Sequence, residues 1–272
     1  MPDLVAVPDI PWYDKILVWK SGGKDSQAVG SVVAQVARNL GVVDRLIAVH
    51  ALLPDDWPEA DKYAEMHAHA YGIERFEKVE RLVEDPETGE KVPQGVIDHA
   101  LARGMFPDKA RRWCTSDHKR SPGRKLMTSL VRELSAEIPD RPVRILSVFG
   151  FRAEESRDRA LHAPFRYDES SSNTLRHVDE WSPIHAWSTA EVKDYVDATG
   201  VAHHRAYDGE DGTPWAGVSR LSCRFCILAS KRDLRIAARH DPQEADRIIG
   251  IERRINHTFR PNQSLEAILN SA

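Results

Sequence analysis

The sequence predicts an α/β fold, with a parallel sheet that carries helices on both faces and a helical C-terminal extension. Short apolar runs of strand length alternate with segments whose apolar residues recur at helical spacing, which is typical of parallel sheets crossed by helices. From Lys231 onward only helical patterns remain, with Pro242 between two of them. We expect an α/β domain over residues 1–200, with residues 201–272 packed on the same domain.

The expected strands follow from apolar runs, and the first one ends at a glycine-rich turn. Helical faces follow the first two runs, from Val29 to Leu40 and from Trp57 to Tyr71, each stopped by a glycine. The four predicted strands are Ile16–Trp19, Leu46–Val49, Phe76–Val79 and Val143–Phe149.

Three polar segments complete the expected organisation. Residues 84–95 hold turn formers and charges and predict a surface loop or hairpin. Residues 166–177 are polar throughout and predict a mobile connection. Ser188-Thr189-Ala190-Glu191 forms a capping box that opens a helix, and Gly200 is placed to end it.

Composition narrows the classes of protein. The 272 residues are 41% hydrophobic and carry a net charge of −4, which suits an ordinary α/β protein without a global nucleic-acid signature. The N-terminal residues lack the pattern of a signal peptide and no run is long enough to span a membrane, so we expect a cytoplasmic protein. Three cysteines, an odd number, favour metal or redox chemistry over a disulfide framework.

The segment Trp19-Lys20-Ser21-Gly22-Gly23-Lys24-Asp25-Ser26 joins the first strand to the first helix. Main-chain N–H groups at such a junction, with the helix N-terminus behind them, bind anions. Gly22 and Gly23 allow close approach, the hydroxyls of Ser21 and Ser26 can donate, and Lys24 adds charge. Asp25 is a candidate holder of Mg²⁺. The spacing fits neither the Walker pattern nor the dinucleotide fingerprint, so the alternative is a plain strand-to-helix turn.

Ser21–Ser26 ("SGGKDS") resembles the pyrophosphate loop of the PP-loop ATP pyrophosphatases. The resemblance implies ATP binding, with Mg²⁺, and cleavage between the α and β phosphates. It points to Lys24, Asp25 and Arg152 as catalytic residues. It also points to a binding set for the nucleotide, namely Ser21, Gly22, Gly23, Lys24, Asp25, Ser26, Arg152, Glu155 and Arg159.

Two further segments resemble the phosphoadenosine-phosphosulfate-reductase-like branch of that superfamily. In "GFRAEESRDRA" (150–160), Arg152, Arg157 and Arg159 are candidate phosphate clamps that Glu154 and Glu155 can orient. The alternative for any one of them is a solvated charge at a helix start. The segment "WSPIHAWSTAEVKDYV" (181–196) resembles the same branch and is mainly structural.

Cys114, in a basic stretch, and the Cys223-x-x-Cys226 pair are candidate metal ligands. From the residues alone, zinc, an iron–sulfur cluster, a redox dithiol and inert thiols all remain open. Iron–sulfur members of the branch hold a [4Fe–4S] cluster with a cysteine pair in the first segment and Cys-x-x-Cys in the second, which favours a cluster here over zinc. This sequence has one cysteine in the first segment, so the fourth position falls to His118, Asp117, another molecule or a substrate sulfide.

No cysteine follows Cys226, where the assimilatory sulfonucleotide reductases carry their catalytic thiol. We therefore expect an ATP pyrophosphatase that adenylates an acceptor, most simply nucleic acid, for insertion of sulfur supplied by a cysteine desulfurase or another donor. The ATP pyrophosphatase of DNA phosphorothioation systems is the favoured likeness. The alternatives are a tRNA thiolation enzyme, a sulfonucleotide reductase, a nitrogen-adding synthetase and a nucleotide-gated scaffold.

The basic segment 103–125 bears on the acceptor. It has two interpretations, a solvated helix face or a surface for substrate phosphates. Its basic residues are Arg103, Lys109, Arg111, Arg112, Lys119, Arg120, Arg124 and Lys125.

Overall fold

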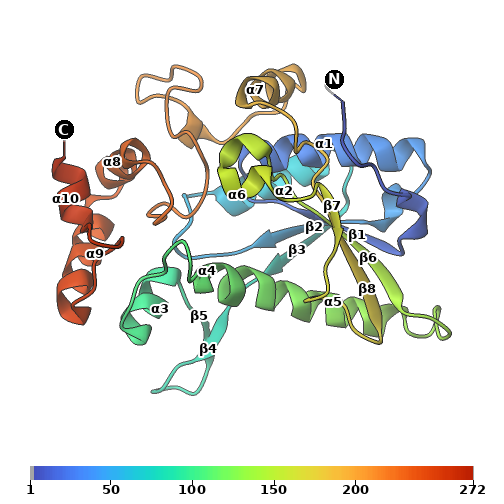
Figure 1. The fold of residues 1–272 in the computed structure, drawn as a ribbon, viewed down its shortest axis with the longest axis horizontal. Helices are drawn as coiled ribbons and strands as arrows, with labels where there is room; N and C mark the ends of the chain where they lie inside the picture. The colour runs from blue at the N-terminus through green and yellow to red at the C-terminus, as the bar shows by residue number, and fades with distance from the viewer. Residues whose placement is uncertain (1–2, 272) are drawn as a thin grey trace. The chain divides into compact units, whose positions relative to one another are not determined.

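A six-stranded sheet forms the centre of the first of two structural units in the computed structural model, which describes residues 3–271 (Figure 1). This unit contains the described residues up to His50, together with Glu59–Val79 and Gly123–His204. Its strand order is β3-β2-β1-β6-β8-β7. The strands are β1 (Lys15–Trp19), β2 (Leu46–Ala51), β3 (Arg75–Val79), β6 (Val143–Val148), β7 (Phe165–Tyr167) and β8 (Arg176–Trp181).

The sheet confirms the predicted α/β class. β1 pairs in parallel with both β2 and β6, β6 pairs in parallel with β8, and β7 runs antiparallel to β8. Ile16, Leu17 and Val18 of β1 have no exposed surface, as expected for a strand covered on both faces. The chain leaves β1 toward β2 on one side and returns to β6 on the other side. Such a reversal creates a crevice at the carboxyl ends of the strands.

Helices cover both faces of the sheet, as predicted. α1 (Lys24–Asn39) and α5 (Ser121–Leu134) lie on opposite sides in Figure 1. Glycines mark the two contacts, because a Cβ on Gly30 of α1 would meet Lys20 and one on Gly123 of α5 would meet Trp19. Successive residues of an extended chain point to opposite faces, so Trp19 and Lys20 meet different helices. α7 (Thr189–Ala198) packs beside α1.

Two local predictions need correction. Residues 166–177 are not a mobile connection, because they contain most of β7 and begin β8. Their polar side chains are paired: Arg176, 7% exposed, donates to Ser171 O at 2.6 Å and to Thr128 Oγ1 at 2.8 Å. The second helix, α2, spans Ala60–Ala70, so Trp57 lies outside it. Pro58 explains that start, since a proline disfavours helical dihedrals in the residue before it.

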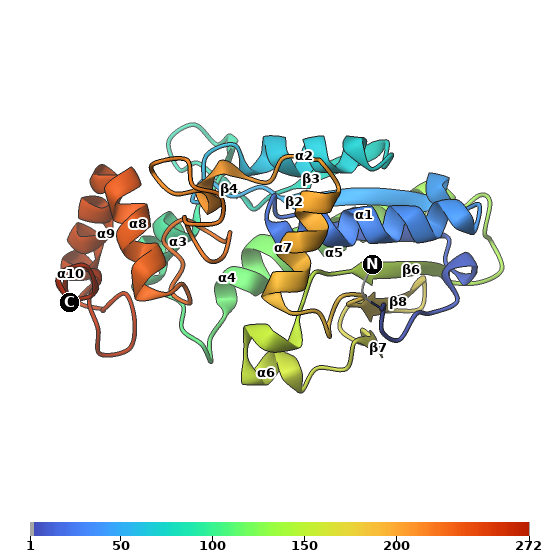
Figure 2. The same ribbon diagram turned by 90° about the horizontal axis from the view of Figure 1, so that it is seen from above.

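The second unit contains Ala51–Pro58, Glu80–Pro122 and the described residues from Arg205 onward. Residues 84–95 lie in the predicted hairpin, formed by β4 (Leu82–Glu84) and β5 (Lys91–Pro93). α3 (Val96–Arg103) and the short α4 (Trp113–Thr115) follow, and a π-helical turn over Ser116–Arg120 leads into α5. The predicted C-terminal helices are present as α8 (Lys231–His240), α9 (Pro242–Ile255) and α10 (Leu265–Asn270), which pack together (Figure 2).

Among residues 3–271, no helix has both the length and the apolar character needed to cross a membrane.

The capping box of α7 gives a test of local structure. Ser188 Oγ accepts a hydrogen bond from Glu191 N at 3.1 Å, and Glu191 Oε2 accepts one from Ser188 N at 2.7 Å. We expect Ser188→Ala to lower the free energy of unfolding by about 1 kcal/mol, because it leaves a helix N–H without its acceptor. Urea unfolding measures the change. Ser129→Ala, at an exposed site inside α5, is the matched control and should change stability little; equal losses would show that the cap is not the cause.

Candidate nucleotide and thiol sites

The candidate nucleotide site begins at the loop between β1 and α1, at the carboxyl end of the sheet. Gly22 has φ of +77°, and a Cβ there would lie 2.4 Å from Ala60 O, so only glycine fits. Ser26 Oγ donates to Gly23 O at 2.8 Å and accepts from Ser21 N at 3.1 Å. Gly23 caps α1 without a side-chain hydrogen bond. Anion binding at this helix N-terminus stays the prediction made from the sequence.

Asp25 links the phosphate loop to the segment after β6. Its Oδ2 accepts from Lys24 Nζ at 2.7 Å, and its Oδ1 accepts from Arg152 Nε at 2.6 Å. Burial disfavours the charged carboxylate, but the charges of Lys24 and Arg152 outweigh burial and lower the pKa of Asp25. Gly150 lets the two segments approach, because a Cβ there would lie 2.9 Å from the Asp25 carbonyl. Three of the predicted site residues therefore form one ionic network.

Arg152 is 3% exposed, and most of its donors already have protein acceptors. Nη1 donates to Glu154 Oε2 at 2.8 Å and to Trp187 O at 3.1 Å, while Nη2 donates to Thr189 Oγ1 at 3.1 Å. Trp187 and Thr189 belong to the "WSPIHAWSTAEVKDYV" segment, so that segment fixes the arginine. Arg152 holds Asp25 in this structure, and its direct contact with phosphate stays a prediction.

The other predicted binding residues lie on the same segment but have local partners. Glu155 Oε2 accepts from Arg152 N at 3.1 Å, and Arg159 Nε lies 3.9 Å from that oxygen. The Arg159 guanidinium lies 3.4 Å from the centre of the Phe151 ring, at the end of a stack with Phe149 and Trp19. Arg157, the remaining candidate clamp, is exposed.

Sequence reasoning missed Lys20. Its side chain is 2% exposed, and its Nζ donates to Ser26 O at 2.7 Å, behind the phosphate loop. Burial lowers the pKa of this lysine to about 7. Its position in the sequence could have indicated this burial, because Lys20 stands between a buried strand and a glycine-rich turn, where its side chain has no direct path to solvent.

The three predicted metal ligands all lie in the second unit and surround one lysine. Cys223, Cys226 and Cys114 all act electrostatically on Lys119 and, together with Asp56, raise its pKa although burial opposes its charge. Burial raises the pKa of the Cys114 and Cys223 thiols. Backbone pairing between Asp56 and Cys223 fixes the second cysteine segment. The structure therefore gathers the two cysteine segments that lie more than a hundred residues apart in the sequence.

The donor set fits an iron–sulfur cluster better than a single ion. Thiolates are the usual ligands of such clusters, and Leu228 N donates to Cys226 Sγ at 3.5 Å, as is common at cluster sulfurs. A single zinc ion needs all of its cysteine sulfur atoms at about 2.3 Å from the same metal position. Across residues 3–271, no group of three or more His, Cys, Asp or Glu is arranged to hold a metal ion. The ligands of an iron–sulfur cluster each bind a different iron, so their sulfur atoms need not point at one common position.

The two candidates for a fourth ligand have other partners. His118 Nε2 lies 3.0 Å from His99 Nδ1, and burial lowers the pKa of His118 to about 4. Asp117 accepts from Ser116 Oγ at 2.5 Å and lies 3.8 Å from Arg103 Nη1. Neither side chain joins the cysteines in a metal-holding group within the part of the chain that is described.

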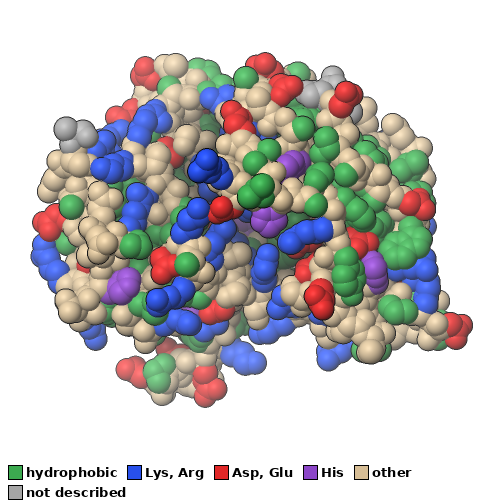
Figure 3. All heavy atoms as spheres, viewed as in Figure 1, with side chains coloured by type: hydrophobic (Ala, Val, Ile, Leu, Met, Phe, Trp, Pro, Cys, Tyr) green, Lys and Arg blue, Asp and Glu red, His purple; other side chains and the backbone are tan. Residues whose placement is uncertain are grey.

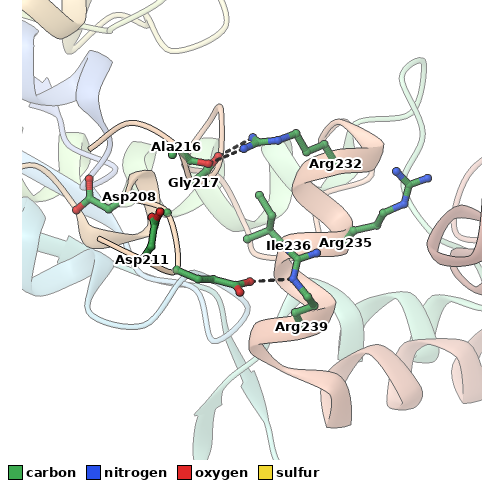
Figure 4. Close-up of a pocket in the computed structure, with 10 residues that line it drawn as sticks. Asp208, Asp211, Ala216, Gly217, Arg232, Arg235, Ile236 and Arg239 are labelled. Carbon is green, nitrogen blue, oxygen red and sulfur yellow. Dashed lines mark hydrogen bonds and ion pairs between the residues drawn. The ribbon is translucent and has the colours of Figure 1, made fainter. Parts of the chain in front are cut away.

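A cavity of about 430 Å³ in the second unit is lined by three arginines of α8 and by the loop 208–217 (Figure 4). Arg232 donates to Ala216 O and Gly217 O, and Arg239 Nε donates to Glu210 Oε1 at 2.8 Å. Arg235, one turn away, also lines it. Lys and Arg side chains are frequent over the C-terminal helices in Figure 3. Sequence reasoning did not single out this face.

The basic segment 103–125 is not one helix face. Arg103, Lys109, Arg111, Arg112 and Arg120 are exposed in the second unit, whereas Lys119 lies among the cysteines. Arg124, in the first unit, donates to Ser170 Oγ at 2.7 Å.

The Asp25 network makes a prediction about stability and pH. Asp25→Asn should lower the free energy of unfolding at pH 7 by about 3 kcal/mol, because it leaves the buried Arg152 short of a charge partner. A lowered pKa stabilises the folded state above the unfolded value of 3.8 and ceases to do so as the pH falls through the folded value. The difference from wild type, measured by urea unfolding, should therefore shrink below about pH 4.

Asp61→Asn is the matched control, since Asp61 pairs with the part-exposed Lys78 at 3.0 Å and should cost less than about 1 kcal/mol. A pH-independent loss in Asp25→Asn would contradict the ionic explanation.

Comparisons with known proteins place this chain in a family. An uncharacterized 37.8 kDa protein of Escherichia phage 186 is 24% identical over 210 residues, which cover 75% of this chain. The chain spans 58% of that relative's length. Among solved structures, the U34-tRNA thiolase of Methanococcus maripaludis, with its [4Fe–4S] cluster, matches at 14% identity and a TM-score of 0.36, over 89% of this chain and 72% of the thiolase. A TM-score of 0.36 is too low to carry over the geometry of a site.

The family model described as the phosphoadenosine phosphosulfate reductase domain matches residues 15–227, which contain β1, the phosphate loop, the Arg152 segment and all three cysteines. The match confirms the likeness predicted from the motifs. The chain belongs to the phosphoadenosine phosphosulfate reductase domain family.

Proposed function

We propose that this protein is an ATP pyrophosphatase that adenylates an oxygen of a nucleic acid, so that sulfur can replace that oxygen, with DNA phosphorothioation as the reaction served. The observation that carries the proposal is the ionic network of Lys24, Asp25 and Arg152 at the N-terminus of α1, whose N-cap residue is a glycine. Such a terminus, with a lysine whose partner is a neighbouring carboxylate, suits a pyrophosphate leaving group.

The chain's own residues account for the first step. An acceptor oxygen attacks the α phosphate of ATP, the bond between the α phosphorus and the bridging oxygen breaks, and pyrophosphate carries away the electron pair. The loop N–H groups and Lys24 stabilise the charge that develops on pyrophosphate. Arg152 keeps Asp25 ionised and in place, which makes this carboxylate the residue that fits Mg²⁺ at the loop.

The second step needs sulfur at the adenylated oxygen, where AMP is now the leaving group. Cys114, Cys223 and Cys226 would hold a [4Fe–4S] cluster, which when bound offers an iron without a cysteine ligand. Lys119 supplies a positive charge beside the thiols and so favours the ionised form of Cys114 and Cys223, against the effect of burial. A cysteine desulfurase is the proposed source of sulfur, which it supplies as a persulfide, and a thiol or ferredoxin-type reductant supplies the two electrons that bring this sulfur to the sulfide level. The sulfur then bonds to the phosphorus, and AMP leaves with the electron pair of the broken P–O bond.

Cationic residues of the second unit support a polynucleotide as acceptor. The α8 arginines lie at i, i+3 and i+7, the spacing of one helix face, and Arg232 is held by two carbonyl oxygens. Arg232 Nη1 also lies 3.9 Å from Asp233 Oδ1, farther than its two carbonyl acceptors, and an arginine held mainly by carbonyl oxygens suits a phosphate. DNA is preferred to tRNA because the branch elements resemble those of the DNA-modifying pyrophosphatases.

ATP turnover tests the proposal. Protein purified without oxygen, given ATP labelled in the α phosphate together with DNA and a cysteine desulfurase, should release pyrophosphate and transfer labelled AMP. Lys24→Ala should slow this release by about a hundredfold, because it removes a charge from the leaving group. Lys62→Ala, at an exposed lysine of α2, should leave the rate unchanged.

Release of ADP and phosphate would contradict α–β cleavage. Intact ATP together with thioredoxin-dependent reduction of adenylyl sulfate would replace the proposal with a reductase. Stimulation by tRNA but not by DNA would move the acceptor to tRNA.

Cluster binding can be measured apart from turnover. After anaerobic incubation with iron and sulfide, wild type should hold about four irons per chain and show broad visible absorption. Cys114→Ser, Cys223→Ser and Cys226→Ser should each lose most of that iron, because each removes one of three thiolate ligands. Ser222→Ala, beside Cys223, is the matched control. One zinc ion per chain that iron does not displace would contradict the cluster.

A further inference from the structure

We propose that Lys20 is a positioning residue of the phosphate loop, holding the first turn of α1 through Ser26 and coupling uptake of a proton to nucleotide binding. This inference rests on the proposed function only in taking the loop as the site of the nucleotide phosphates. Lys20 does not touch the predicted binding atoms and acts through the carbonyl oxygen of Ser26.

The geometry ties Lys20 to the loop from behind. Its main-chain N donates to Val49 O at 2.8 Å, which continues the β1–β2 pairing past the last strand residue. Its side chain then turns inward, so that Nζ reaches Ser26 O at 2.7 Å. Ser26 is also the residue whose hydroxyl accepts from Ser21 N. The lysine therefore braces the residue that closes the loop.

The sequence keeps room for this contact. A Cβ at Gly30 would lie 2.2 Å from Lys20 Nζ, so any larger residue would displace the ammonium. Gly30 stands in the middle of α1, where glycine weakens a helix relative to alanine. A glycine at this position is explained by the lysine that it accommodates.

Among residues 3–271, no carboxylate contributes to the pKa shift of Lys20. Burial alone lowers its pKa to about 7. The titratable groups packed around it are His67 of α2, Tyr71 directly after α2 and His50 of β2. The centre of the Tyr71 ring lies 5.6 Å from Lys20 Nζ. Burial, and to a smaller extent the charge of Lys20, lowers the pKa of His67 to about 3. Burial raises the pKa of Tyr71. His67 and Tyr71 therefore stay neutral where Lys20 titrates.

Two buried acceptors beside this group have no partner. Gln27 Oε1 and His67 Nδ1 make no hydrogen bond, and both side chains have no exposed surface. Gln27 Nε2 lies 3.3 Å from Tyr71 OH, the ring that Lys20 also borders. Unpaired buried acceptors favour a nearby positive charge. The site is thus arranged to take up a proton once anionic phosphates arrive on the other side of the loop.

The consequence is a link between pH and affinity. Phosphates at the loop stabilise the ammonium form and raise the pKa of Lys20, so binding takes up a proton above pH 7. If the pKa rises by one unit, affinity falls about tenfold as the pH increases from 6 to 9. Without Lys20, this part of the pH dependence disappears.

The test uses the full chain and an ATP analogue with a methylene group between the α and β phosphorus atoms. Isothermal titration in two buffers of different ionisation heat at pH 7.5 should show proton uptake in wild type and none in Lys20→Met. The affinity of Lys20→Met should be weaker at pH 6 and flat between pH 6 and 9. His50→Gln and Tyr71→Phe are the controls that change the neighbouring titratable groups, and both should keep the uptake.

Two readouts keep the outcomes distinguishable. Gly30→Ala should mimic Lys20→Met in the wild-type chain and have little further effect in Lys20→Ala, where space is free. Unchanged proton uptake in Lys20→Met, with binding still lost in Lys24→Ala, overturns this inference alone. Binding that Lys24→Ala leaves unchanged, or no binding at all, overturns the proposed function and this inference together.

Stability without ligand gives an independent check. The pKa of Lys20 in the folded chain lies below its unfolded value of 10.5, so the unfolded chain binds more protons between about pH 7 and pH 10.5. The free energy of unfolding therefore increases as the pH rises through this range. Lys20→Met should lack that gain. The same rise in both proteins would show that Lys20 is not buried as a titrating group.

Discussion

The ion pair between Asp25 and Arg152 is the constraint on which the nucleotide site depends. It joins the first turn of α1 to the segment after β6, the two strand ends on either side of the reversal in strand order. Because Arg152 is buried, its charge must be matched within the protein. Asp25, Glu154, Trp187 and Thr189 supply the acceptors, and Glu154 is itself bonded to Thr189 at the start of α7.

This constraint explains why segments far apart in sequence are needed together. The loop alone offers N–H groups and a lysine, but it does not orient its own aspartate. The segment after β6 orients it, and the start of α7 holds that segment through Thr189. Gly22 and Gly150 then act as spacing elements, since each lies against a backbone where a Cβ would not fit. Lys20 braces the same turn from the interior.

The three thiols are held in place by main-chain structure and not by an ion pair. They are held by backbone pairing of Cys223 with Asp56 and by the π-helical turn that follows α4, and their shared electrostatic neighbour is Lys119. Burial keeps two of the thiols protonated at neutral pH, so a metal group must displace protons as it binds. A cation beside them reduces that cost, which explains a lysine in a place that looks from the sequence like part of a basic surface.

The sequence by itself determined the sheet class and the glycine-rich loop between β1 and α1, because these follow from local patterns, namely buried apolar runs and glycines at a strand-to-helix junction. Its Cys-x-x-Cys spacing singled out the thiols as candidate ligands. It also determined the capping box of α7 and the hairpin. It misled at residues 166–177, where Arg176 donates to Ser171 O in the preceding turn and to Thr128 Oγ1 of α5, because a single segment does not reveal its partners.

Only the tertiary structure decided that Arg152 serves Asp25, that Lys119 stands among the cysteines and that Lys20 is buried. Each of these outcomes depends on which long-range neighbour receives a long charged side chain. Such a side chain reaches solvent from most positions, so its burial is set by packing and not by local pattern.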